Sequence, residues 1–128
     1  MNSHPLNVES LESYQTDGFL AVREFLGAER LRELINNVDR FVRDIVPMMP
    51  VEHAFYEDKS DPGTLKQIQN MGDYDPWFHE LFTDRRIREL AEALLGGSVV
   101  PKNLHYLNKP SGVGQPTPAH QDGYYFML

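Results

Sequence analysis

A long apolar stripe with helical spacing limits the folds that this chain can adopt. Apolar side chains recur every three or four residues over positions 31–45, which places them on one face of a helix. The stripe consists of Leu31, Leu34, Ile35, Val38, Phe41, Val42 and Ile45. Pro47 ends it, because proline cannot donate an intrahelical hydrogen bond. The spacing predicts a helix that covers one face of a sheet.

Three shorter helices are predicted, each with a side chain that can cap its N-terminus: Asn7, Asp75 and Asp84. The first helix runs to Asp17, the second begins at Pro76 directly after its cap, and the third ends at the glycine pair 96–97. We expect the apolar face of the third helix to be buried. That face consists of Ile87, Leu90, Ala91 and Leu94.

Extended segments alternate with these helices and dominate the last quarter of the chain. Residues 19–22 are predicted as a short strand or extended segment, and helical periodicity stops at Ser98. The other predicted strands are residues 51–56, 65–70, 99–107 and 119–128. Residues 109–118 are rich in glycine and proline and are predicted as a loop. Helices followed by strands indicate an α+β, mainly β class with an antiparallel sheet.

The chain has the length and composition of one domain, with 128 residues of which 41% are hydrophobic. We expect a helical part over about residues 8–97 and the first core strands over about 98–128. The chain ends within an apolar strand, which would leave an open sheet edge. We therefore expect residues 1–128 to be the N-terminal portion of an incomplete domain. Self-association through that last strand is another way to cover the edge.

Composition excludes several classes of function. The chain has no cysteine, so disulfides, iron–sulfur clusters and thiol nucleophiles are excluded, and a metal site must use His, Asp or Glu. A net charge of −7 argues against nucleic-acid binding, which needs a basic surface. We expect a cytoplasmic protein with no membrane association, because neither a secretory leader nor a long apolar run is present.

His120 and Asp122 form the most informative pair of polar residues. Two residues apart on a predicted strand, their side chains would point to the same face. An imidazole and a carboxylate side by side are two of the three ligands in the 2-His-1-carboxylate triad that binds ferrous iron. Alone the pair is a weak signal, since a His–Asp hydrogen bond on a sheet is the more ordinary explanation. His53 has no evident partner, whereas His105, on the same face as Leu107, could line a cavity.

The surroundings of the pair resemble the phytanoyl-CoA dioxygenase family. The similar segments are Leu-Asn-Lys-Pro at 107–110, Gly-Val-Gly-Gln-Pro-Thr-Pro at 112–118 and His-Gln-Asp-Gly-Tyr-Tyr-Phe at 120–126. An early segment, Tyr14 to Leu20 with Asp-Gly-Phe at 17–19, followed by a long amphipathic helix, is also similar, so the resemblance runs from about residue 10 to the end. The family consists of non-haem Fe(II)/2-oxoglutarate oxygenases on a double-stranded β-helix, or jelly roll. The resemblance implies that the helices here pack on part of such a sheet.

The resemblance also implies roles for individual residues. His120 and Asp122 would be Fe(II) ligands, and Gln121 would contact the co-substrate 2-oxoglutarate. By rough alignment, further 2-oxoglutarate contacts fall at Gln67 and His105, although an ordinary surface position on a strand is the alternative for Gln67. The aromatic residue on the same face as the metal ligands, Tyr124, would line the substrate pocket.

The resemblance predicts a dioxygenase that uses molecular oxygen to hydroxylate an unactivated C–H bond of a small organic substrate. The third iron ligand, a histidine, and the arginine that pairs with 2-oxoglutarate would lie beyond residue 128, so this chain alone is expected to be inactive. One alternative is a truncated, non-catalytic binding or assembly module derived from that fold. Another is a small cupin-like metal-binding protein, which would require further histidines near the pair. The identity of the substrate does not follow from these residues.

Overall fold

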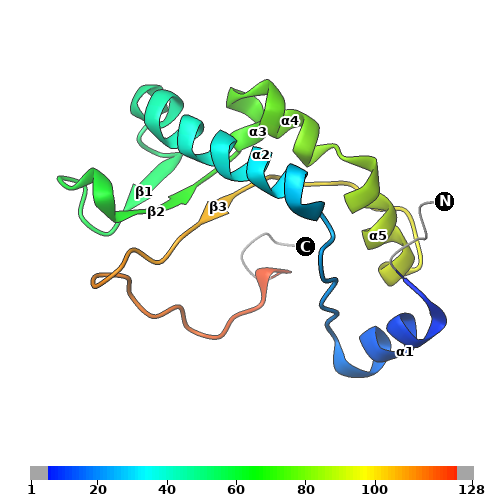
Figure 1. Cartoon of the computed structure of the whole chain (residues 1–128). Helices are drawn as coiled ribbons and strands as arrows, with labels where there is room; N and C mark the ends of the chain where they lie inside the picture. The colour runs from blue at the N-terminus through cyan, green and yellow to red at the C-terminus, as the bar shows by residue number, and fades with distance from the viewer. Residues whose placement is uncertain (1–5, 124–128) are drawn as a thin grey trace.

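The computed structural model describes residues 6–123, in which helices cover one side of a small antiparallel sheet (Figure 1). The helices are α1 (Val8–Asp17), α2 (Gly27–Arg40), α3 (Met71–Tyr74), α4 (Pro76–Phe82) and α5 (Arg85–Leu95). The strands are β1 (Ala54–Tyr56), β2 (Leu65–Ile68) and β3 (Tyr106–Leu107). This arrangement confirms the α+β class. Within residues 6–123, no helix is both long and apolar enough to cross a membrane.

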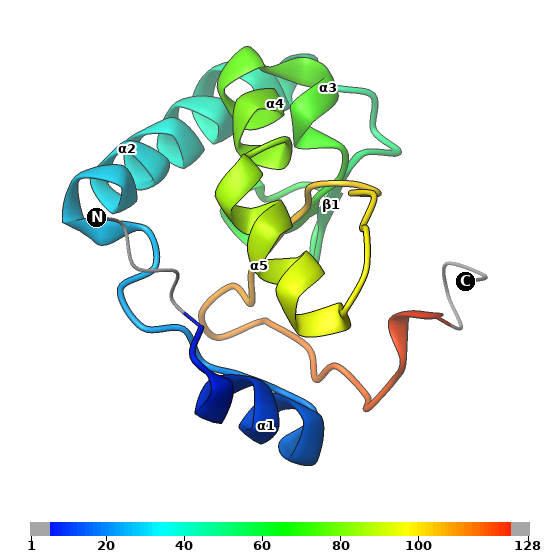
Figure 2. The same ribbon diagram turned by 90° about the vertical axis from the view of Figure 1, so that its right-hand side faces the viewer.

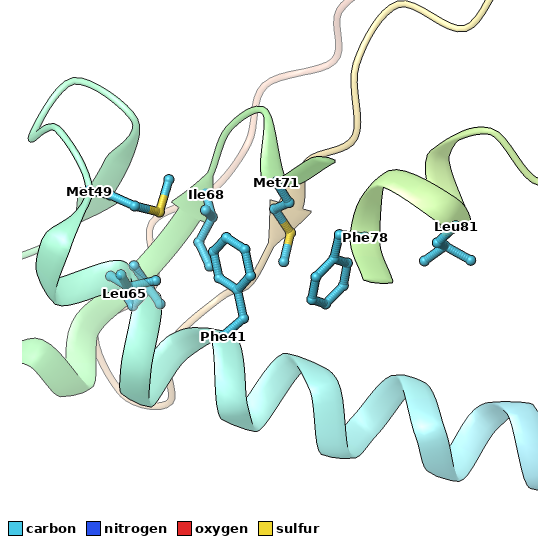
Figure 3. Close-up of a cluster of buried hydrophobic side chains, with 8 residues drawn as sticks. Phe41, Met49, Leu65, Ile68, Met71, Phe78 and Leu81 are labelled. Carbon is cyan, nitrogen blue, oxygen red and sulfur yellow. The ribbon is translucent and has the colours of Figure 1, made fainter. Parts of the chain in front are cut away.

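The predicted scaffold helix is present as α2, and its C-terminal end packs on the sheet. Phe41 is fully buried with Leu65 and Ile68 of β2 (Figure 3). The ring of Phe78 from α4 meets Phe41 edge-on at 5.2 Å between centroids. The spacing predicts a regular helix to residue 45, but the α-helix ends at Arg40. It widens into a π-helical turn (Phe41–Ile45) and then a 3-10 turn (Val46–Met48), because the ring of Pro47 cannot follow a regular α-helical turn.

The two strands predicted over residues 51–56 and 65–70 are present in shorter form as β1 and β2, and β2 is the central strand of the sheet. The strand order is β1-β2-β3, and both pairs are antiparallel. Between the first two strands, the buried hydroxyl of Thr64 donates to the carbonyl oxygens of Asp58 and Asp61, which fixes the turn. The core therefore lies between β2, the end of α2 and the α3–α4 pair.

Two strand predictions at the C-terminal end were wrong in extent. Of the predicted strand 99–107, only Tyr106 and Leu107 pair with β2, because β2 is short and the chain turns into α3 soon after it. Residues 119–121 have no strand structure, and the backbone of Asp122 and Gly123 is helical. The described part of the chain offers these residues no strand to pair with. Residues 124–128 of that prediction lie outside the described range. Residues 19–22, predicted as a short strand or extended segment, are not assigned as a strand.

The predicted burial of α5 was also wrong. Its N-cap Asp84 and its terminating Gly96, with φ of 71°, are as predicted, but none of its residues is buried, and Ile87 is 40% exposed. Ile87, Ala91 and Leu95 of α5 line a groove of about 300 Å³ together with residues 99–101. Figure 2 shows α5 beyond the end of α4, and α1 apart from the sheet.

Candidate functional site

A cavity of about 770 Å³ whose lining residues are mostly polar or charged (the polar cavity) lies between the sheet and the loop that follows β3. Its walls include Gln67 and His105 on the sheet side and His120 and Asp122 on the loop side. These are four of the six residues that the sequence predicts for the site. In Figure 1 the chain leaves β3, makes a wide arc and returns toward the helices, which brings the two groups to one space.

The strand register places Gln67 and His105 on the same face of the sheet. Gln67 is opposite Leu107, and Ile68 is opposite Tyr106. Because side chains alternate along a strand, His105 and Leu107 share the face of Gln67. The intervening Tyr106 packs against the core on the other face. The core therefore fixes which side chains face the cavity.

Burial favours the neutral form of His105. The pKa of its imidazole is lowered from its usual value, because desolvation penalises the charged ring. A neutral imidazole has one nitrogen that donates and one that accepts a hydrogen bond. His105 can therefore contact either a polar group or a carboxylate of a ligand in the polar cavity.

The loop after β3 starts from a firm attachment to β2. Asn108 donates its backbone N–H to the carbonyl of Lys66 at 2.8 Å and its side-chain N–H to the carbonyl of Leu65 at 3.0 Å. The chain then folds tightly, with the N–H of Gly114 donating to the carbonyl of Pro110 at 2.9 Å. A Cβ at Gly114 would lie 3.0 Å from that carbonyl oxygen, so only glycine fits without a shift.

His120 and Asp122 are in contact, although they do not lie on the predicted strand. Nε2 of His120 lies 3.3 Å from Oδ1 of Asp122. Nδ1 of His120 lies 2.8 Å from the carbonyl oxygen of Pro118, which can only accept, so Nδ1 carries a proton and donates it. The lone pair of a neutral ring then points from Nε2 toward a carboxylate oxygen, which also only accepts. A metal ion or a proton between these two atoms would make the contact attractive.

The geometry of this pair fits two ligands on one metal ion. Two donor atoms at right angles, each about 2.1 Å from a metal, are about 3.0 Å apart. The observed 3.3 Å is close to that separation. The Pro118 carbonyl holds the ring orientation, as outer hydrogen-bond partners of metal-bound histidines usually do. Across residues 6–123, however, no cluster of three or more His, Asp or Glu side chains is positioned to hold a metal.

Two predicted site residues remain, Gln121 and Tyr124. Gln121 is exposed and is not part of the described cavity wall, and Tyr124 lies outside the described residues. His53 has a partner after all: its Nδ1 is hydrogen-bonded to the hydroxyl of Tyr74, away from the cavity. The sequence reasoning missed Glu57 and Lys66, which also line the cavity. Lys66 directly precedes the predicted site residue Gln67, and this adjacency is the feature of the sequence that could have pointed to it.

The fold is of the α+β class, and its cavity brings His120 and Asp122 together with Gln67 and His105. The family model for phytanoyl-CoA dioxygenase (PhyH) matches residues 14–127, and the chain belongs to this family. This confirms the resemblance seen in the sequence and indicates an oxygenase-like class. No curated protein and no solved structure matches the chain.

Proposed function

We propose that this protein is an Fe(II)- and 2-oxoglutarate-dependent dioxygenase that hydroxylates an unactivated C–H bond of a small organic substrate. The observation that carries the proposal is the convergence of Gln67, His105, His120 and Asp122 on one polar cavity. These residues come from β2, from the segment just before β3 and from the loop after β3. The fold therefore brings them together, and not closeness in the sequence. The jelly roll typical of the family and a cytoplasmic location are parts of the same proposal.

His120 and Asp122 would hold the iron, and Gln67 and His105 would orient the co-substrate. Bound iron with 2-oxoglutarate supplies the activation of molecular oxygen. The Pro118 carbonyl keeps Nε2 of His120 aimed at the metal position. The neutral ring of His105 provides hydrogen bonding without adding positive charge beside the metal. Gln121 and Tyr124 remain proposed contacts of co-substrate and substrate.

Two protein ligands define only part of such a site. A third ligand, expected to be a histidine, and an arginine that pairs with a carboxylate of 2-oxoglutarate complete the set in the proposal. We therefore expect residues 1–128 by themselves to bind divalent metal weakly and to turn over little or no 2-oxoglutarate.

Metal titration tests the ligand assignment. Under anaerobic conditions, Fe(II), or Co(II) as a spectroscopic substitute, should bind the chain, and His120→Ala or Asp122→Ala should weaken binding about tenfold or more. His79→Ala is the matched control, because His79 is exposed on α4 and outside the polar cavity. Equal affinity in all variants would contradict the assignment.

A non-catalytic binding or assembly module is the second candidate, favoured by the apolar groove beside α5. Concentration-dependent sedimentation distinguishes the two. Self-association together with metal affinity that is unchanged in His120→Ala would favour the module. A monomer whose metal binding depends on His120 would favour the dioxygenase.

A further inference from the structure

Glu57 connects the sheet to the loop that carries His120 and Asp122. It directly follows β1, and its side chain is only 17% exposed. Oε2 accepts a hydrogen bond from Nζ of Lys66 on β2 at 3.3 Å. Oε1 accepts the backbone N–H of Gln115, 58 residues away in the sequence, also at 3.3 Å. The Glu57 carboxylate thus links the end of β1 to β2 and to the loop after β3.

The contact between Glu57 and Gln115 lies between the tight turn of the loop and His120. The start of the loop is attached to β2 through Asn108, and the tight turn to Gly114 closes on itself through the carbonyl of Pro110. Gln115 is where the chain leaves that turn, and five residues later it reaches His120. A contact at Gln115 therefore sets the direction in which the chain approaches the polar cavity.

A carboxylate is the group that can make both contacts. Each oxygen accepts from a donor: the Lys66 ammonium on one side and the Gln115 N–H on the other. Glutamine has nearly the same shape, but its NH₂ would face one of these two donors. Glu57→Gln must therefore lose one contact while keeping the volume and the backbone geometry.

We propose that Glu57 is a positioning residue, which holds the Gln115–Asp122 segment so that the metal-ligand pair faces Gln67 and His105. The proposal rests on the proposed function, because it assumes that His120 and Asp122 bind metal. Glu57 itself touches neither of these residues in the described contacts and need not touch the metal. Its ion pair with Lys66 holds the carboxylate in the cavity wall.

Glu57→Gln in the full chain tests the proposal with Co(II) as the probe. We expect Co(II) affinity to fall about fivefold, which corresponds to the loss of one hydrogen bond. The visible spectrum of bound Co(II) should change shape, and amide hydrogen exchange should accelerate at Gln115 and over residues 119–123. Glu52→Gln is the matched control, because Glu52 is exposed just before β1. If Glu57 only stabilised the fold, Glu57→Gln would lower the melting temperature without changing the spectrum of bound Co(II).

The outcomes separate the two proposals. If Co(II) binding depends on His120 but is unchanged in affinity, spectrum and exchange by Glu57→Gln, the positioning role is overturned and the metal site stands. If the unaltered chain binds no Co(II), the proposed function fails. The positioning role is then decided by hydrogen exchange, and unaltered exchange at Gln115 and 119–123 in Glu57→Gln would overturn it.

Discussion

His105 shows how burial on a sheet face changes the chemistry of one residue. Its pKa is lowered by desolvation, so the folded state binds a proton less readily than the unfolded chain. When pH falls through the ordinary histidine value of about 6.5, the unfolded state takes up a proton first. Folding stability contributed by the neutral ring is therefore present above that pH and is lost as pH falls toward the lowered pKa.

We expect the free energy of unfolding to depend less on pH in His105→Gln than in the unaltered chain. Between pH 7.5 and pH 5.5, the unaltered chain should lose more stability, because its unfolded state binds a proton at position 105 more readily than its folded state does. Urea denaturation at the two pH values measures this difference. His79→Gln serves as the control, because that ring is exposed. The same pH dependence in His105→Gln and the unaltered chain would contradict the assignment.

At the residue scale, the sequence predicted that His120 and Asp122 would lie side by side, but for a reason that was partly wrong. His120 and Asp122 were paired because residues two apart on a strand share a face, yet they meet in a loop through the orientation that Pro118 imposes. His105 and Leu107 do share a face, as predicted. Glu57 could not be found from the sequence, because its role depends on a contact across 58 residues.

Among the described residues, two aspartates cap α-helices, and they differ in their surroundings. Asp84 at the start of α5 accepts from the N–H of Arg86 at 2.8 Å, and its pKa is lowered by the hydrogen bonds of Arg86. Asp75 at the start of α4 accepts from two backbone N–H groups and also pairs with Arg40 of α2 at 2.8 Å. Asp75 is 6% exposed, so it connects two helices inside the core.

We expect Asp75→Ala to destabilise the chain by about 2–3 kcal/mol, because it removes a cap and leaves Arg40 without its carboxylate. Asp84→Ala removes a cap and a contact to a nearby surface arginine, and should cost about 1 kcal/mol. Chemical denaturation of both variants makes the comparison. Equal losses would show that the Arg40 pair adds nothing beyond capping.

Element predictions succeeded where local chemistry decides the outcome. The caps of α1, α4 and α5 were found because a capping side chain and a terminating glycine act within one turn. The short α3 was missed, since it is only four residues long and packs against α4, which the local sequence does not show. The predicted length of β3 was wrong, because a strand can pair only as far as its partner strand extends and β2 is short.

At the scale of the whole molecule, the accessible surface is larger than that of a typical compact protein. The structure exposes 9877 Å², whereas a folded protein of 14.8 kDa exposes about 7,000 Å². Part of the excess is apolar and includes Leu95 and Val100, which line the groove beside α5. The prediction that α5 would be buried followed from its amphipathic pattern. That pattern shows which face is apolar but not what covers it.

The groove beside α5 should bind the dye ANS, because its apolar walls are accompanied by the cationic side chain of Arg88, which suits the sulfonate. Val100 is 80% exposed there, and Val100→Thr replaces a methyl group with a hydroxyl of similar size. We expect roughly fourfold weaker ANS binding, measured by fluorescence titration. Val51→Thr is the matched control, because Val51 is 85% exposed but does not line the groove. Equal affinity of both variants would place the dye elsewhere.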